Sequence, residues 1–203
     1  MEAIERDYYG EYAAVLESAQ AMILEEVKRI LAVLTPDSEH APAEHLRSRI
    51  KSAQSLQAKL AKQGFEEDAH SGMVHLMDLV GVRIITHFVG DVYAILEELQ
   101  RSPLWKVVWV KDYISNPKPN GYRSLHVIIE IPIESPRLST MRAEIQLRTI
   151  AMDCWASLEH QLKYKKNIQN TDLIVRELKR CADEMASTDL SMQTIRELIE
   201  GGD

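Results

Sequence analysis

Apolar side chains recur every three or four positions along the first part of the chain, which is the spacing of an amphipathic helix. The pattern predicts one long helix, or two nearly continuous ones, over residues 3–34. Thr35-Pro36-Asp37 then indicates a helix end, and a polar loop follows up to Pro42. Residues 43–50 fit either an extended strand or the beginning of a helix. A further helix is predicted from Ser52 to Gly64, because glycine readily adopts the left-handed conformation that ends a helix.

After Gly64, helical periodicity alternates with short runs that are rich in valine, isoleucine and aromatic residues. The runs at residues 127–131 and 145–147 are separated by a short loop, so we expect them to form an antiparallel hairpin. Asp91 is expected to cap the helix predicted over residues 91–100, which follows the strand at residues 80–86. The predicted elements are helix 66–77, strand 80–86, helix 91–100, strand 106–114, strand 124–131, strand 141–148, helix 149–163, helix 171–185 and a short closing helix.

This succession predicts an α/β (α+β) fold, in which a mixed sheet of four or five strands is surrounded by helices. The 203 residues are enough for one substantial core, and the 45% hydrophobic and 27% charged residues are typical of a folded soluble domain. The sequence has no apolar run of about 18 residues or more. Its start carries Glu2, Glu5 and Asp7 rather than a basic patch and an apolar segment. We therefore expect no membrane segment and a cytoplasmic location.

Cysteine content and charge narrow the possible partners. Cys154 and Cys181 do not form a CxxC pair and fall in predicted helices, so we expect reduced, buried thiols rather than a disulfide. The formal net charge of −7 disfavours non-specific nucleic-acid binding, which depends on a basic surface. A nucleotide pocket remains open, because it needs a local cluster of cations rather than a basic protein.

A basic segment, Arg49-Ile50-Lys51 followed by Ser55 and Lys59, provides groups that bind polyanions. Lys51, Ser55 and Lys59 follow one another at four-residue intervals, so a helix would place them on one face. A helix N-terminus would add backbone N–H donors for phosphate. For this segment alone a solvated basic helix face is the more common interpretation, and a phosphate site is the functional alternative.

Asp78 lies at the start of a predicted buried strand, and Arg83 lies within that strand. Carboxylates are seldom left unpaired near a core, because their desolvation is costly. Two interpretations are equally open. Asp78 is either a cap or an ion-pair partner of Arg83, or it is a Mg²⁺ ligand beside a planar cation that binds a base or a phosphate.

Residues 116–126, N-P-K-P-N-G-Y-R-S-L-H, form the most informative stretch. Two prolines stiffen a loop that carries Lys118, and an Asn-Gly pair supplies a turn with positive φ. Strand alternation would then place Tyr122, Ser124 and His126 on one face. An aromatic ring beside a lysine and a histidine suits a nucleotide. The structural alternative is a plain loop in which Tyr122 packs at a sheet edge.

Polar residues alternate with apolar ones in the last predicted strand, so Glu144, Gln146 and Arg148 share one face. In an isolated strand this is usually the solvent side. The chemical alternative is that Glu144 joins Asp78 on Mg²⁺ and also activates a hydroxyl, since Mg²⁺ is usually held by one or two carboxylates plus substrate phosphates. Glu159-His160 lacks the spacing of a zinc motif, so a structural helix is expected there.

Taken in order, four segments resemble the synthetase domain of RelA/SpoT proteins. The similarity spans about Arg49 to Lys165, and its combined motifs are highly specific. With no hydrolase domain before it and no regulatory domain after it, the chain is similar to the small alarmone synthetases. The segments are R-I-K-S-x-x-S-x-x-x-K, D-L-V-G-V-R, K-D-Y-I-x-N-P-K-P-N-G-Y-R-S-L-H and E-I-Q-L-R-T-I-A-M-D-x-W-A-S-L-E-H-Q-L-K-Y-K.

The resemblance implies a single domain with a nucleotidyltransferase-like mixed sheet of about five strands. A helical extension over residues 1–42 would precede a catalytic core over 43–165, with C-terminal helices over 166–203. The implied activity is Mg²⁺-dependent transfer of pyrophosphate from ATP to the 3′-hydroxyl of GDP, GTP or GMP. Carried over by position, the resemblance implies that Asp78 and Glu144 bind Mg²⁺ and carry out catalysis. On the ATP side it implies adenine binding by Arg49 and Arg83 and phosphate binding by Lys51, Ser55 and Lys59. On the acceptor side it implies guanine stacking by Tyr122, and the residues implied to bind the guanosine nucleotide and its phosphates are Lys111, Lys118, Asn120, His126 and Gln146.

Some small alarmone synthetases are tetramers that pppGpp activates through Phe, Thr and Asn side chains, so the resemblance also implies a homotetramer. The matching positions here are His45, Arg47 and Asp153. A carboxylate at Asp153 would disfavour a phosphorylated nucleotide nearby, which argues against this activation.

Two alternatives to a guanosine-nucleotide synthetase remain. The same fold could modify adenosine nucleotides or the 3′ CCA end of tRNA, although the charge of −7 counts against tRNA. A binding module that has lost its activity would predict a broken carboxylate pair, whereas Asp78 and Glu144 are both present.

Overall fold

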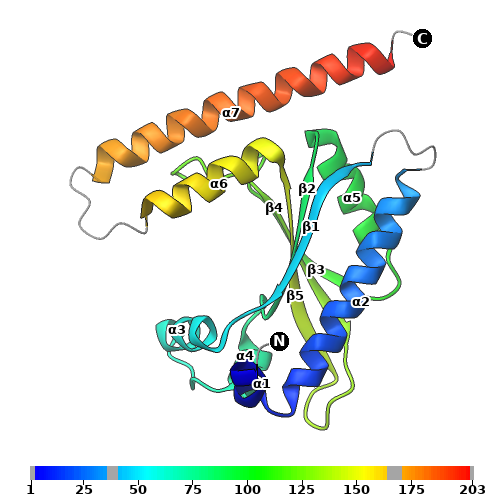
Figure 1. Cartoon of the computed structure of the whole chain (residues 1–203), viewed down its shortest axis with the longest axis vertical. Helices are drawn as coiled ribbons and strands as arrows, with labels where there is room; N and C mark the ends of the chain where they lie inside the picture. Colours follow the sequence, from blue (N-terminus) through cyan, green and yellow to red (C-terminus); the bar gives the residue numbers. More distant parts are fainter. Residues whose placement is uncertain (1–2, 36–40, 164–170, 202–203) are drawn as a thin grey trace.

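A computed structural model of the protein describes residues 3–35, 41–163 and 171–201. Its centre is a five-stranded mixed sheet with the strand order β1-β2-β5-β4-β3 (Figure 1). β2 and β5 are parallel, and the other neighbouring pairs are antiparallel, including the predicted β4–β5 hairpin. The strands are β1 (Ala43–Ile50), β2 (Val80–Thr86), β3 (Lys106–Asp112), β4 (Leu125–Pro132) and β5 (Thr140–Thr149).

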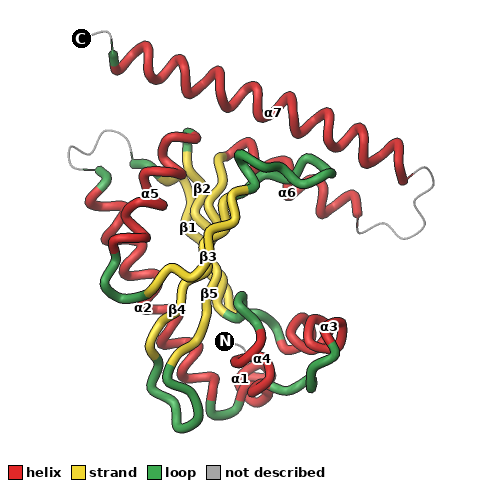
Figure 2. Tube along the Cα trace, turned by 180° about the vertical axis from the view of Figure 1, so that it is seen from behind, coloured by secondary structure: helices red, strands yellow, loops and turns green. Residues whose placement is uncertain are grey.

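Helices cover the two sides of the sheet unequally. α2 and α5 lie against one side, whereas α3 and α6 lie toward opposite ends of the other side (Figures 1 and 2). α7 packs on α6 and also contacts α5. The helices are α1 (Ala3–Tyr9), α2 (Tyr12–Val33), α3 (Ala53–Gln63), α4 (Ala69–His75), α5 (Val89–Arg101), α6 (Ile150–Lys163) and α7 (Thr171–Glu200).

The core lies between the sheet and the pair α2 and α5. Alternation along β5 shows why, because Met141, Ala143, Ile145 and Leu147 are buried there while the residues between them point to the opposite side. Full burial of a side chain as large as Met141, Ile145 or Leu147 contributes roughly 1.5–3 kcal/mol. The sheet therefore has one apolar face that holds the fold together and one polar face that is available for chemistry. The core residues that α2 and α5 contribute include Leu16, Ile23, Ile30, Val92, Ile95 and Leu99.

The predicted mixed α/β sheet of about five strands is confirmed, and residues 43–50 form a strand. The N-terminal helical region is two helices, because the chain turns at Gly10, whose φ is 52°. Gly64 ends α3 in the left-handed conformation, as predicted. α2 ends at Val33, and the predicted loop over residues 36–40 lies outside the described residues, as do Tyr164 and Lys165.

Three predictions about helix boundaries were wrong. α4 is shorter than residues 66–77, and α5 begins at Val89 with Phe88 as its N-cap. Asp91 is the third residue of α5 and accepts a hydrogen bond from the Phe88 backbone N–H at 3.1 Å, so it caps the helix from within. The two expected C-terminal helices are one continuous helix, α7. Asp189 lies in the polar segment after residue 185, where a break was expected. Its carboxyl group is buried and accepts a 2.6 Å hydrogen bond from the Thr149 hydroxyl, which holds this segment of the helix against the sheet.

The cysteines are both free, which agrees with the absence of a disulfide. The expectation that both thiols are buried was wrong, because Cys154 is exposed on α6 and Cys181 is half-buried on α7. Within the described ranges, no helix has both the length and the apolar character needed to cross a membrane.

Candidate active site

The strand register aligns polar residues in two rows across the free face of the sheet. In the first row Arg49 of β1, Gly81 of β2 and Glu144 of β5 are neighbours. Gly81 places no side chain between Arg49 and Glu144, and a Cβ added there would be in ordinary van der Waals contact with the Arg49 Cγ, at 3.9 Å. The second row crosses all five strands and consists of Arg47, Arg83, Gln146, His126 and Lys111.

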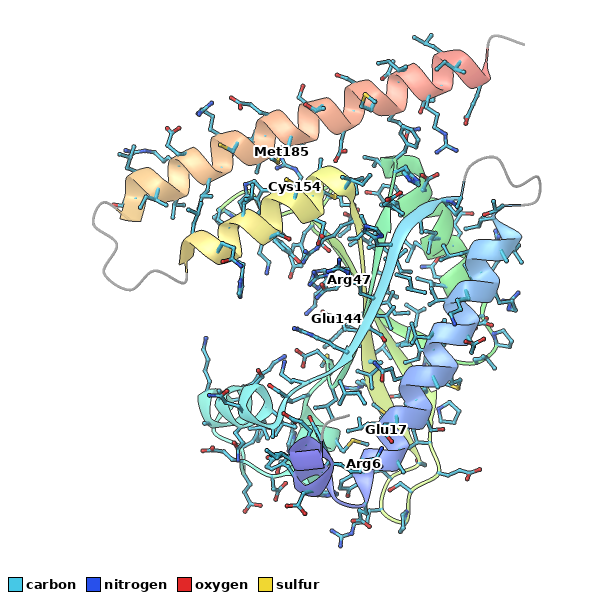
Figure 3. The ribbon with its side chains drawn as sticks, viewed as in Figure 1. Arg6, Glu17, Arg47, Glu144, Cys154 and Met185 are labelled. Carbon is cyan, nitrogen blue, oxygen red and sulfur yellow. The ribbon has the colours of Figure 1, made fainter. Side chains whose placement is uncertain are left out.

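A cleft of about 210 Å³ lies over these rows. It is on the side of the sheet that faces the region between α3 and α6, where Figure 3 shows Arg47 and Glu144. The cleft combines carboxylates with several guanidinium groups, which is the composition expected of a site for a metal–polyphosphate ligand. Its lining residues are Arg47, Ser48, Arg49, Asp78, Gly81, Val82, Arg83, Glu144 and Gln146.

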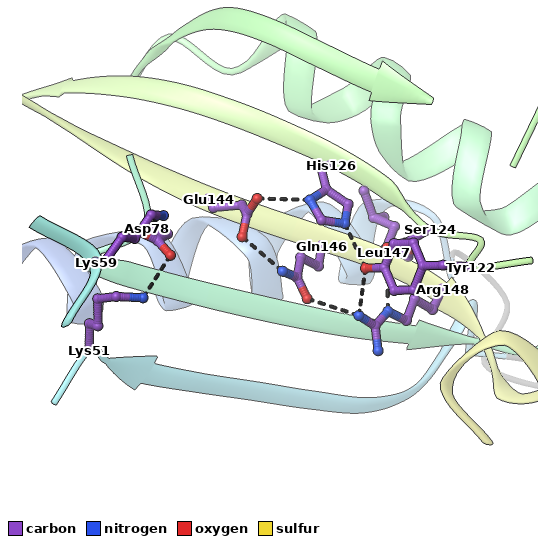
Figure 4. Close-up of polar contacts among 10 residues, drawn as sticks. All are labelled: Lys51, Lys59, Asp78, Tyr122, Ser124, His126, Glu144, Gln146, Leu147 and Arg148. Atoms are coloured by element: carbon purple, nitrogen blue, oxygen red, sulfur yellow. Dashed lines mark hydrogen bonds and ion pairs between the residues drawn. The ribbon is translucent and has the colours of Figure 1, made fainter. Parts of the chain in front are cut away.

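Asp78 sits just before β2 and is held by two cations (Figure 4). Lys51 Nζ donates to Asp78 Oδ2 and Lys59 Nζ donates to Asp78 Oδ1, both at 2.8 Å. Burial raises the pKa of Asp78, but the hydrogen bonds and charges of the two lysines outweigh burial and leave the pKa below its ordinary value. Asp78 is therefore ionised at neutral pH.

Both lysines reach Asp78 from the segment after β1, but they do not lie on one helix face. α3 begins at Ala53 with Ser52 as its N-cap, so Lys51 precedes the helix instead of continuing its face, and that prediction was wrong. The Lys51 backbone N–H bonds to the Leu79 carbonyl at 2.7 Å, which fixes it beside the start of β2. Ser55 lies on the first turn of α3, where its hydroxyl contacts the Ser52 hydroxyl at 2.8 Å.

Glu144 on β5 is held by side chains of the sheet. His126 Nδ1 lies 2.8 Å from Glu144 Oε1, and Gln146 Nε2 donates to Glu144 Oε2 at 2.8 Å (Figure 4). Burial raises the pKa of Glu144, and so does the charge of Asp78, but the hydrogen bond and charge of His126 lower it to a net value below the ordinary one. Two ionised carboxylates thus face one cleft, a repulsion that a divalent cation would relieve.

The donor set bears on which metal would fit. Among the described residues, no group of three or more His, Cys, Asp or Glu side chains is arranged to hold a metal ion. Mg²⁺ typically binds through one or two carboxylates and completes its shell with waters and substrate phosphates. Asp78 and Glu144 fit that pattern.

Tyr122 is positioned by a tight loop between β3 and β4. Gly121 has φ 91°, and a Cβ at this position would lie 2.6 Å from the Ala182 Cβ on α7, so glycine is needed both for the turn and for the packing. The Asn120 side chain accepts from the Tyr122 backbone N–H at 3.2 Å. The Lys118 Nζ lies 5.0 Å from the centre of the Tyr122 ring. The loop thus places a ring and a cation together, as predicted.

A directional chain of hydrogen bonds joins Tyr122 to Glu144. Arg148 Nη2 donates to the Tyr122 hydroxyl at 2.8 Å, and that hydroxyl lies 2.8 Å from His126 Nε2. Because a carboxylate can only accept, His126 carries a proton on Nδ1 toward Glu144, and a neutral His126 accepts from Tyr122 at Nε2. The shared orientation of Glu144, Gln146 and Arg148 on one strand face is confirmed by these contacts.

Three residues of this region had no catalytic or substrate-binding role predicted from the sequence, although Arg47 and Asp153 were matched to positions implied in pppGpp activation. Arg148 was recognised on the correct face but not as a partner of Tyr122. Arg47 lines the cleft, and Asp153 on α6 accepts hydrogen bonds from Arg148 at 3.0 Å and from Arg83 at 3.4 Å. Two-residue spacing from Arg49 and from Gln146 could have indicated Arg47 and Arg148, whereas Asp153 depends on how α6 packs on the sheet.

One predicted residue is less closely associated with the cleft. The register places Lys111 beside His126, but the Lys111 Nζ lies 5.5 Å from the centre of the exposed Trp109 ring. Lys118 and Asn120 belong to the Tyr122 loop, where the Asn120 amide donates to Glu159 at 3.1 Å.

A larger groove of about 590 Å³ lies between α7 and the start of α5. Its lining is mostly apolar, and its charged residues bind one another, since Arg196 donates to Asp91 at 2.6 Å and to Glu200 at 2.7 Å. The smaller cleft has the carboxylate pair and the cations, so its chemistry identifies it as the better active-site candidate despite its size.

Comparisons with known proteins agree with this geometry. A profile of the region found in RelA / SpoT proteins matches residues 48–169. The chain is 44% identical over 162 residues to GTP pyrophosphokinase YwaC of Bacillus subtilis, covering 79% of this chain and 77% of that protein. It is 30% identical over 172 residues to GTP pyrophosphokinase YjbM of the same organism, covering 84% and 80%. The chain therefore belongs to the RelA/SpoT family, as its motifs indicated.

Solved structures give the same result for the fold. The crystal structure of small alarmone synthetase 1 from Bacillus subtilis bound to its product pppGpp matches with a TM-score of 0.80 at 28% identity, covering 91% of this chain and 94% of that one. Small alarmone synthetase 2 from the same organism matches with a TM-score of 0.73 at 40% identity, covering 88% and 95%. The fold is thus that of the small alarmone synthetases.

Proposed function

We propose that this protein transfers the β,γ-pyrophosphate of ATP to the 3′-hydroxyl of GDP or GTP and so produces ppGpp or pppGpp. The relatives named GTP pyrophosphokinase and the related structure bound to pppGpp support this activity. The observation that carries the proposal is that Asp78, Glu144, Arg49 and Arg83 line one cleft. At its edge Lys51 and Lys59 bind Asp78, and Tyr122 is linked to Glu144 through His126.

Asp78 and Glu144 would hold Mg²⁺ in this proposal. The bound ion would supply charge stabilisation for the transferred group. Lys51 and Lys59 are able to move from Asp78 to the ATP phosphates, because both are flexible side chains and their charge would be attracted to the polyphosphate. Ser55 at the N-terminus of α3 would add a hydroxyl donor for the same phosphates. Protein groups that neutralise phosphate charge are the main contribution expected in such transfers.

The two nucleotides would occupy opposite parts of the cleft. Arg49 and Arg83, in neighbouring rows of the sheet, would sandwich the adenine of ATP. Tyr122 would stack on the guanine of the acceptor, with Lys118 and Asn120 from its loop and Gln146 and Lys111 from the sheet binding the rest of that nucleotide. Adjacent subsites on rigid strands would bring the 3′-hydroxyl and the ATP phosphate close together, which is the main source of rate in such reactions.

Glu144 would accept the proton from the 3′-hydroxyl. It is ionised at neutral pH, and His126 and Gln146 fix the direction of its oxygens. Because its pKa lies below the ordinary value for a glutamate, Glu144 is a weak base, so its contribution would depend on position within hydrogen-bond reach of the hydroxyl.

The test is incubation of the purified protein with ATP, Mg²⁺ and GDP, GTP or GMP in turn, followed by ion-exchange separation of the nucleotides. We expect a 3′-pyrophosphorylated guanosine nucleotide and AMP, and the three reactions give the acceptor preference. Adenosine nucleotides and tRNA serve as the alternative acceptors. Product with either of these and none with guanosine nucleotides would refute the proposal, as would the absence of product with every acceptor.

We also propose that the protein is a cytoplasmic homotetramer. α6 and α7 expose apolar side chains that oligomerisation could cover, among them Leu158, Leu162, Leu190, Leu198 and Ile199. Light scattering coupled to size-exclusion chromatography would measure the mass, and a monomer across micromolar concentrations would contradict the assembly. Initial rates with and without added pppGpp would test activation, which we do not expect because Asp153 is a carboxylate already bound to two arginines.

A further inference from the structure

Arg148 is a buried arginine whose contacts lie among the proposed acceptor-binding residues. Its side chain is 7% exposed, and its Nη2 donates to the Tyr122 hydroxyl at 2.8 Å and to Gln146 Oε1 at 3.4 Å. The guanidinium carbon lies 5.2 Å from the centre of the Tyr122 ring. Its Nε donates to the Ser124 hydroxyl at 3.4 Å. A planar guanidinium has donors in a rigid fork, so it can hold a ring and an amide in fixed directions, whereas the donors of a lysine rotate on a flexible stem.

Asp153 connects this arginine to the other side of the cleft. The same oxygen, Oδ1, accepts from Arg148 Nη1 at 3.0 Å and from Arg83 Nη1 at 3.4 Å. Arg83 is half-buried, and its pKa is lowered by burial and by the neighbouring charge of Arg148. Asp153 therefore supplies the negative charge that allows two guanidinium groups to remain side by side.

We propose that Arg148 and Asp153 are a positioning pair shared by the two nucleotide subsites. Arg148 fixes Tyr122 and Gln146 for the guanosine nucleotide, and Asp153 fixes both Arg148 and Arg83, so that it acts on the ATP side as well. This inference rests on the subsites assigned under the proposed function. Neither residue touches the reacting atoms, so both act through the side chains that they orient.

Other contacts secure the helices near this pair. Trp155 Nε1 donates to the Leu178 carbonyl at 2.9 Å, which ties α6 to α7, and Thr149 donates to the buried Asp189 of α7. Arg123, next to Tyr122 in the chain, donates to Asp183 of α7 at 2.9 Å. Because these attachments do not involve Arg148 or Asp153, conservative changes in the pair are expected to leave the packing of α6 and α7 in place.

The test compares Arg148→Lys and Asp153→Asn with the wild type and with Asp183→Asn as the matched control. Asp183→Asn removes a carboxylate from an arginine next to Tyr122, but this carboxylate lies on α7 and binds Arg123 and Lys179 rather than Arg148 and Arg83. Calorimetry measures the dissociation constants of GDP and of a non-hydrolysable ATP analogue for the full chain with Mg²⁺. Thermal unfolding of each variant shows whether the fold is retained.

We expect Arg148→Lys to weaken GDP binding about ten-fold and to leave binding of the ATP analogue nearly unchanged, since hydrogen bonds from a charged group to Tyr122 and Gln146 are lost. Asp153→Asn should weaken both ligands, by about five-fold or more, because both arginines lose their charged partner. Asp183→Asn should change neither constant.

A folded Arg148→Lys variant that binds both ligands as the wild type does, or weakens both equally, overturns the proposal. If Asp153→Asn does not fold, Arg148→Lys decides alone, because it retains the positive charge opposite Asp153. Product formation by the wild type separates this result from the proposed function. If the variants show the expected changes in dissociation constants but the wild type forms no alarmone, the proposed function is refuted and the positioning pair is supported. If the wild type forms alarmone but the dissociation constants do not change as expected, the positioning pair is refuted and the proposed function is supported. A wild type that binds neither nucleotide would refute both.

Discussion

The two carboxylates of the cleft are held in different ways. Asp78 is bound by two lysines that come from outside the sheet, one after β1 and one on α3. Glu144 is bound by His126 and Gln146, which both stand on strands of the sheet. Lysines on flexible stems can exchange a carboxylate for a phosphate, whereas side chains on paired strands keep their direction. We therefore expect the Asp78 side of the cleft to rearrange when nucleotide binds and the Glu144 side to keep its arrangement.

The largest effects are expected from neutralising each carboxylate. Glu144→Gln should lower kcat about a thousand-fold, within the range typical of a lost general base. Asp78→Asn should be similarly inactive, but raised Mg²⁺ should restore part of its activity, because Glu144 and the phosphates could still hold the ion. Steady-state rates over a Mg²⁺ series measure both. Glu130→Gln, which removes a carboxylate bound to Arg142 on the same sheet, is the control. If raised Mg²⁺ also restored the activity of Glu144→Gln, the two carboxylates would not differ in the way proposed.

Lys59→Met should give the next largest effect, on ATP rather than on the acceptor. We expect kcat/KM for ATP to fall about 10- to 100-fold, the loss expected for one charge-assisted hydrogen bond. The KM for GDP should change little. Lys62→Met is the matched control, because it removes a lysine from the last turn of the same helix, whereas Lys59 is the one that binds Asp78. Equal changes in the two KM values would mean that Lys59 acts by stabilising the fold around Asp78.

His126→Asn should have a smaller effect, because it loosens Glu144 without removing it. We expect kcat to fall about ten-fold from the loss of the hydrogen bonds to Glu144 and Tyr122. The KM for ATP should be nearly constant. A large rise in the KM for ATP, with kcat unchanged, would show that the Glu144 side does not depend on the sheet network.

The smallest expected effect is on the pH dependence of stability. The folded-state pKa of Glu144 lies below its ordinary value of 4.5, so the ionised carboxylate stabilises the fold above that pH, and this stabilisation is lost as the pH falls through the folded-state pKa. Urea unfolding from neutral pH down through the ordinary carboxyl range should show the wild type losing more stability than Glu144→Gln. If the free energy of unfolding falls equally steeply with pH in the two proteins, the lowered pKa of Glu144 is contradicted.

The sequence predicts most of the fold because its strands have clear apolar periodicity and its turns contain glycine or proline. It also predicts which side chains of β5 share a face, since Glu144, Gln146 and Arg148 alternate with buried residues. The α7 prediction failed for a tertiary reason. The polar stretch around Asp189 resembles a break in sequence, but that carboxyl group is buried against Thr149.

The partners within the cleft were harder to predict. Lys51 reaches Asp78 because the chain leaves β1 beside the start of β2, which helical spacing could not indicate. The link from Arg83 through Asp153 to Arg148 depends on where α6 crosses the end of the sheet. Contacts between distant segments follow from packing geometry, and one sequence read in short windows does not contain that information.

The parallel pairing of β2 with β5 has a consequence for the order of events in folding. Asp78, just before β2, and Glu144 on β5 meet because these strands are adjacent, although α5, β3 and β4 separate them along the chain. Pairings between distant segments are slow steps in folding, because a long loop must close before the contact forms. Catalytic competence should therefore appear late in refolding, together with closure of the central strands, and partly folded chains should be inactive even when most of their helices have formed.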